Sequence, residues 1–153
     1  MLLPVTKVID LKYFPLVVLV LPPQLDMSYA DLLEHDTRAI FTLRSRYVSI
    51  TDSSAVAGMP DAKTRTRMGD WAKSHEDEFR RWQVANALMV SSAIVRAGIS
   101  AIHWLAPPPV PTVVETDWAV ALAFLRKHAE QDALDTTGLT AFSHRQRAHA
   151  SAS

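Results

Sequence analysis

The pattern of hydrophobic and polar residues in the first third of the chain predicts two strands, a helix and a third strand. Residues 5–11 and 16–21 are rich in Val and Leu and flank a short turn, which is typical of a hairpin. Apolar residues then recur at helical spacing after Asp26 and Ser28, either of which can cap a helix. The β-branched and apolar run at 47–51 predicts a central strand.

The rest of the chain continues the alternation of helices and strands. In order, it predicts a charged amphipathic helix over 62–83, a strand over 87–90, a helix ending at the prolines from 107 to 111, a strand over 112–115 and a helix after Asp117. The residues that can cap these helices are Asp61, Ser91 or Ser92, and Asp117.

This alternation favours a mostly parallel sheet built through right-handed crossovers. The predicted fold is α/β: a single-layer, mostly parallel five-stranded sheet with an N-terminal hairpin, covered by about four amphipathic helices. We expect one domain over residues 1–134. Residues 135–153 have few large apolar side chains and predict a disordered C-terminal tail.

Composition narrows the classes of partner and cofactor. The chain of 153 residues has 16 basic and 16 acidic residues, so it lacks the positive field that favours nucleic acids and anionic membranes. The longest apolar run, at 16–21, is far shorter than the roughly 20 residues of a membrane-spanning helix. The sequence has no cysteine, which favours a cytoplasmic protein, and its histidines and glycines form no metal or phosphate motif. We therefore expect no cofactor and no metal.

Three stretches of the chain resemble the STAS domain superfamily, which has the fold of anti-sigma-factor antagonists, and bacterial relatives similar to Sec14 lipid-transfer domains. They are FPLVVLVLP, RYVSITDSS and LMVSSAIVRAGISAIHWLAPPPVPTVVETDWAVALAFL. The resemblance implies a STAS-like fold and a non-enzymatic, protein-binding module of bacterial signalling. In one branch of the family, it also implies a serine in an Asp-Ser-Ser-Gly segment that is phosphorylated to release a partner.

The comparable segment here is Asp52-Ser53-Ser54, followed by Ala instead of Gly and placed directly at a strand end. Counted from the start of the helix, as in the family, the nearest hydroxyl is that of Thr64. These four residues are the candidates for a regulatory loop. The alternative is that the short polar side chains only bond to their own backbone at the start of a loop.

Two polar residues lie in the middle of apolar helical stripes. Asp36 and His75 belong to the first two long helices, which are expected to pack side by side. A carboxylate beside an imidazole could serve a hydrolase, but no nucleophile motif accompanies them. The alternative is a buried polar pair with a structural role.

Several apolar residues lie off the predicted core stripes and are candidates for an interaction surface. They are Trp104, Pro107, Pro108, Val120 and Phe124. If exposed and contiguous, they would form a patch for a partner protein or a second copy of the chain. The alternative is that loops cover them.

The first functional prediction is thus a non-enzymatic, self-associating interaction module of a bacterial signalling system. The alternative is a small Sec14-like carrier of an apolar ligand, with a cavity lined by residues such as Trp71, Phe79, Trp82 and Ile102. A remote alternative is a hydrolase that uses His75 and Asp36.

Overall fold

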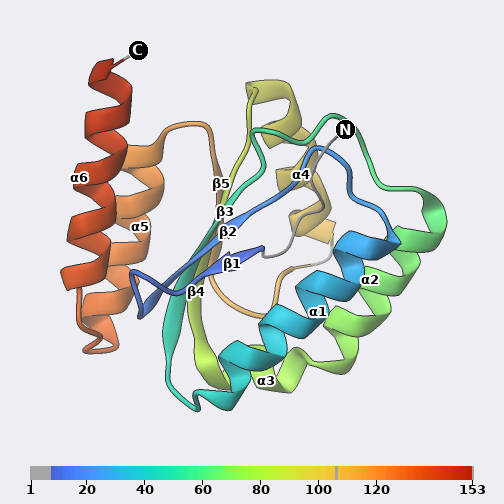
Figure 1. Ribbon diagram of the computed structural model, residues 1–153, viewed down its shortest axis with the longest axis horizontal. Coiled ribbons are helices and arrows are strands. Elements are labelled where there is room, and N and C mark those ends of the chain that lie inside the picture. Colours follow the sequence, from blue (N-terminus) through green and yellow to red (C-terminus); the bar gives the residue numbers. More distant parts are fainter. Residues whose placement is uncertain (1–7, 106, 153) are drawn as a thin grey trace.

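The computed structural model describes residues 8–105 and 107–152, except for the side chains at 94, 98, 99, 101, 102 and 105. One five-stranded sheet lies between two groups of helices (Figure 1). Its strands are β1 (Ile9–Asp10), β2 (Leu16–Val20), β3 (Tyr47–Asp52), β4 (Gln83–Met89) and β5 (Thr112–Glu115).

The strands lie in the order β1-β2-β3-β4-β5. β1 is antiparallel to β2, and every other neighbouring pair is parallel. The helices are α1 (Met27–Thr42), α2 (Ala62–Ser74), α3 (Glu76–Trp82), α4 (Ala93–Leu105), α5 (Trp118–Gln131) and α6 (Thr137–Ala152). Helices α5 and α6 lie on one side of the sheet, and α1, α2 and α3 on the other (Figure 1). The predicted α/β class, with a mostly parallel sheet and an N-terminal hairpin, is confirmed.

The segment predicted as one helix over 62–83 is different in the structure. It is broken at His75 into α2 and α3, and β4 begins at Gln83 instead of position 87. Gln, Asn and Ala are weak strand formers, so the local pattern concealed the start of β4. Pairing with β3 along its length overrides that local preference.

The predicted disordered tail is also wrong, because residues 137–152 form α6. Leu139 and Phe142 are each only 2% exposed, and the Phe142 ring packs edge-on against Tyr13 at 5.3 Å between centroids. Two well-placed apolar side chains are sufficient here because they dock on a core that the sheet and α5 have already formed. The domain therefore extends through α6.

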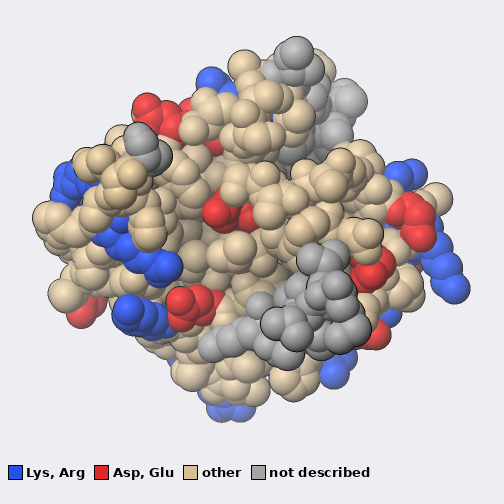
Figure 2. Space-filling model, turned by 45° about the horizontal axis from the view of Figure 1, so that its top comes forward, with Lys and Arg blue, Asp and Glu red and all other residues tan. Residues whose placement is uncertain are grey.

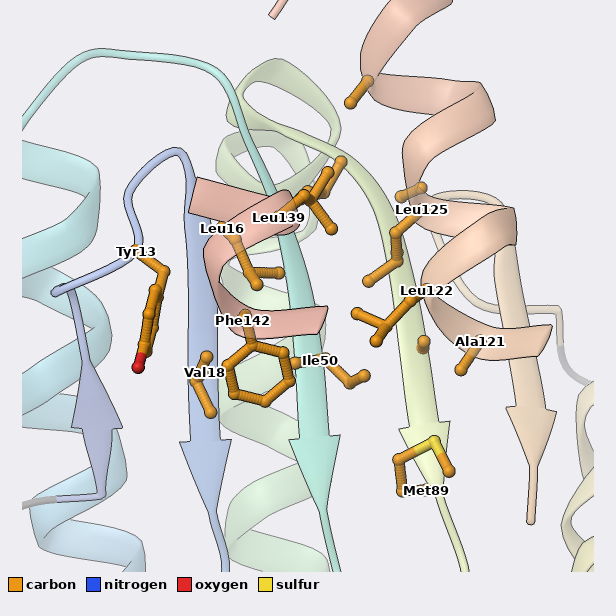
Figure 3. Close-up of a cluster of buried hydrophobic side chains, with 14 residues drawn as sticks. Tyr13, Leu16, Val18, Ile50, Met89, Ala121, Leu122, Leu125, Leu139 and Phe142 are labelled. Carbon is orange, nitrogen blue, oxygen red and sulfur yellow. The ribbon is translucent and has the colours of Figure 1, made fainter. Parts of the chain in front are cut away.

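The two faces of the sheet are packed differently. The face toward α5 and α6 forms one close-packed cluster in which Val18, Ile50 and Leu122 meet Phe142 and its neighbours (Figure 3). On the other face, α2 packs mainly against α1 and α3. A space thus remains between the sheet and this layer of helices.

Candidate functional site

A cavity of about 710 Å³ lies between the sheet and the layer formed by α1, α2 and α3. The segment 107–110, which follows α4, closes one end of it. Its wall is mostly apolar and includes Leu19, Leu33, Met68 and Phe79. Cavities of roughly 300–1,000 Å³ with such walls and a few polar groups are the usual form of small-molecule sites.

The sheet side of this cavity carries a row of polar residues. Ser49 of β3 is paired with Asn86 of β4, and Asn86 is paired with Thr112 of β5, so the three lie side by side across the strands. Strands of a parallel sheet that is covered on both faces are normally apolar on both. Ser49 and Asn86 on the central strands depart from this pattern on the face that lines the cavity.

A chain of hydrogen bonds joins the polar residues. The side-chain amide of Gln83 donates to Oγ of Ser49 at 2.7 Å, and this hydroxyl donates to Oδ1 of Asn86 at 2.8 Å. Ser49 itself is 1% exposed, whereas Gln83 and Asn86 are half-buried. The chain holds both amides at the sheet while leaving part of each accessible.

The charged groups at the cavity are balanced at its rim. Glu34 receives a two-pronged contact from Arg67, with N–O distances of 3.2 and 3.1 Å, and Glu76 pairs with Arg80. The third charged residue of the lining, Lys73, is exposed to solvent. At the sheet, burial raises the pKa of Tyr47 well above its ordinary value, so its phenol is neutral. The inner part of the cavity is thus uncharged.

Comparisons with models of protein families, with curated proteins and with solved structures gave no match to this chain. Within residues 8–105 and 107–152, no helix has the length and apolar character needed to cross a bilayer. Figure 2 shows acidic and basic side chains interspersed over one face, with neither sign forming a continuous patch. Within the described residues, the cavity and its polar row are the features from which a function can be argued.

The residues predicted to line an apolar cavity are found in different places. Trp71 and Phe79 do line it, and their rings pack edge-on at 5.8 Å. Trp82 lies outside it, in a surface groove where Arg81 covers its ring at 5.0 Å. The side chain of Ile102 lies outside the described residues. The polar row was missed, although Ser49 and Thr51 alternate with buried residues in the predicted central strand.

The hydrolase pair is not formed. Asp36 accepts hydrogen bonds from the backbone N–H groups of Val8, at 2.9 Å, and Ile9, at 3.3 Å, and so anchors β1 to α1. His75 lies at the break between α2 and α3, stacked on Trp71 at 4.7 Å. Asp36 and His75 each have their own local partners. The predicted pairing of Asp36 with His75 is therefore wrong.

The four candidates for a regulatory loop have unequal access to solvent. The Ser53 hydroxyl donates to the carbonyl of Met89, and Asp52 accepts the N–H of Ser54 at 3.0 Å, which is ordinary turn chemistry. Thr64 is fully buried, so a kinase cannot reach it in the folded protein. Ser54 alone of the three hydroxyl residues is exposed.

The candidate interaction surface is divided between two parts of the molecule. Trp104 is 83% exposed and shares a shallow hollow with Pro107 and Pro108. Val120, 48% exposed, and Phe124 lie on α5, and Phe124 packs against the core. Trp104 and Val120 are thus exposed, whereas Phe124 is half-buried. Its ring faces inward because the stripe of α5 is wider than the sequence pattern indicated.

Proposed function

We propose that the protein is a non-catalytic binding protein that takes up an apolar or amphipathic small molecule between the sheet and α1, α2 and α3. The observation that carries the proposal is the cavity of about 710 Å³ on one face of a sheet whose other face is close-packed. Small globular proteins generally fill such a space with side chains. A ligand in the cavity would supply the missing contacts.

The position of the cavity supports the carrier over the interaction module that the sequence first suggested. Binding sites of α/β proteins are commonly formed between structural layers and bury most of a ligand's surface. The lining comes from three helices and all five strands of the sheet, so an occupant would link elements that contact each other weakly. Ligand binding should therefore raise the melting temperature, because it stabilises the folded state alone.

The test is a native mass spectrum of the protein purified from its own cells, compared with a spectrum of the denatured chain. We expect a small adduct that is lost on denaturation. Ala72→Phe places a ring at the cavity and should abolish both the adduct and the binding of the neutral fluorophore N-phenyl-1-naphthylamine. Ala39→Phe, on the exposed face of α1 outside the cavity, should change neither.

Equal fluorophore binding by the wild-type protein and the Ala72→Phe variant would overturn the proposal, as would its absence in both. Circular dichroism of each variant identifies any that fails to fold. In that case Gly69→Leu, at another position of α2 in the cavity lining, replaces Ala72→Phe.

A second candidate function is self-association through α4, as expected for an interaction module. The observation that favours it is the exposure of Trp104, at 83%, near the end of this helix. Large aromatic residues in such positions are enriched in protein interfaces. Sedimentation equilibrium should then show a dimer that Trp104→Ser converts to a monomer. A wild-type monomer at every concentration contradicts this candidate.

A further inference from the structure

We infer that the cavity selects a neutral amphiphile whose polar group both donates and accepts hydrogen bonds, such as a long-chain alcohol, and that Gln83 and Asn86 hold that group. The inference rests on the proposed function, because it names the ligand class for the same cavity. It starts from a local irregularity in β4. That irregularity brings two amides together that a regular strand would separate.

Residues three apart in a regular strand point to opposite faces of a sheet. The pairing of β3 with β4 shifts register, however, so that Tyr47 is opposite Gln83 while the next residue, Val48, is opposite Ala85. Val84 is the extra residue of this bulge. As a result, Gln83 and Asn86 both line the cavity. Bulges commonly re-aim a side chain beside a functional site.

The hydrogen-bond chain leaves a defined pair of groups for a ligand. Gln83 uses its N–H group on Ser49, and Asn86 uses its carbonyl oxygen to accept from Ser49. Within the described residues, the carbonyl oxygen of Gln83 and the NH₂ group of Asn86 make no hydrogen bond. The Gln83 carbonyl oxygen and the NH₂ group of Asn86 therefore remain side by side, with the second N–H of Gln83 beside them, on amides that share the same hydroxyl.

Together the Gln83 carbonyl oxygen and the Asn86 NH₂ group match a hydroxyl, whereas a carboxylate can satisfy the NH₂ group but not the carbonyl oxygen. A ligand hydroxyl can donate to the Gln83 carbonyl and accept from the Asn86 amide. A carboxylate can only accept hydrogen bonds. It would also lose hydration at this inner surface, where Ser49 is 1% exposed, and no cation lies in the polar row to compensate for that loss. The cation in the lining, Lys73, is on α2 and exposed. The body of the amphiphile would pack against apolar residues such as Leu19, Leu33 and Met68.

The test measures displacement of N-phenyl-1-naphthylamine from the full-length protein by decan-1-ol and by decanoate at pH 8. We expect decan-1-ol to displace the fluorophore at a concentration about tenfold lower than decanoate does. The carboxylate leaves the Gln83 carbonyl oxygen without a hydrogen bond, whereas the alcohol donates one to it. Asn86→Leu should weaken the binding of decan-1-ol, relative to that of the fluorophore, by about tenfold. Val114→Leu, on the neighbouring strand and outside the cavity lining, is the matched control and should leave both affinities unchanged.

Equal displacement by the two compounds, or tighter binding of decanoate that Lys73→Met abolishes, overturns the inference but leaves the proposed function standing. Failure of the fluorophore to bind the wild-type protein overturns both. If Asn86→Leu does not fold, Ser49→Ala removes the hydroxyl that orients both amides and should give the same loss of preference for the alcohol.

Discussion

Replacing Gly138 by Ala should undock α6 in part. Gly138 lies in the first turn of α6, against the turn between β1 and β2. An added Cβ would overlap the carbonyl oxygen of Tyr13 and come within 2.7 Å of its carbonyl carbon. That carbonyl is fixed because it accepts the N–H of Leu16 at 2.9 Å. The helix must therefore withdraw from the hairpin.

The size of the effect follows from the side chains that α6 buries. Complete burial of Leu139 and Phe142 contributes about 1.5–3 kcal/mol each. A withdrawal of roughly 0.5–1 Å forfeits a quarter to a half of such contacts. Against this loss, Ala gains less than about 1 kcal/mol in helix propensity over Gly. We expect a net loss of about 1–2 kcal/mol and a melting temperature lower by about 5 °C.

Gly69→Ala is the matched control, because its Cβ would meet nothing within 4 Å in the interior of α2. It should stabilise the protein by about 0.5–1 kcal/mol. Urea unfolding followed by far-ultraviolet circular dichroism measures both variants. If Gly138→Ala proves as stable as the wild-type protein, or more stable, α6 does not dock on the hairpin turn.

Three further predictions concern the anchoring of β1, the core and acid stability. Asp36→Ala leaves two backbone N–H groups without their carboxylate and should lower the free energy of unfolding in urea by about 1.5–3 kcal/mol. An unchanged free energy of unfolding would contradict the anchoring of β1 by Asp36. Leu125→Ala should lower the free energy of unfolding by about 2–5 kcal/mol, whereas Val120→Ala, at an exposed position, should change it by no more than about 0.5 kcal/mol. Similar losses in the two variants would contradict the packing of α5. Hydrogen bonds from Thr64 and Thr137 hold the pKa values of Asp61 and Asp135 below the ordinary 3.8, so their contribution is present above that pH and is lost as the pH falls. The melting temperature should drop on acidification, and less steeply in Asp135→Asn; an unchanged slope would contradict the role of this carboxylate.

The helix starts could be predicted because their signals are local. Asp26, Asp61 and Asp117 each accept an N–H group two or three residues further along the chain, as expected of helix caps. The strands β2, β3 and β5 were equally evident, since most of their buried residues are β-branched or large and apolar.

The cavity could not be predicted in the same way, because it depends on contacts between distant segments. Ser49 and Asn86 are 37 positions apart, and the bulge that aligns Gln83 with Asn86 exists only through pairing with β3. The docking of α6 likewise depends on Tyr13, which lies far away in sequence. A pattern of residues within one segment carries no information on either arrangement. It gives the elements and their faces but not the space between them.

The unequal packing of the two sheet faces has a consequence for motion. Opening free energies within one protein range from near zero up to the global value, in cooperative units. α5 contacts three strands directly, whereas α2 rests on its neighbouring helices. Backbone amides of α2 should therefore exchange with deuterium well before those of α5, through an opening that leaves the sheet intact. Such an opening of a single layer would let the proposed ligand enter and leave while the rest of the molecule remains folded.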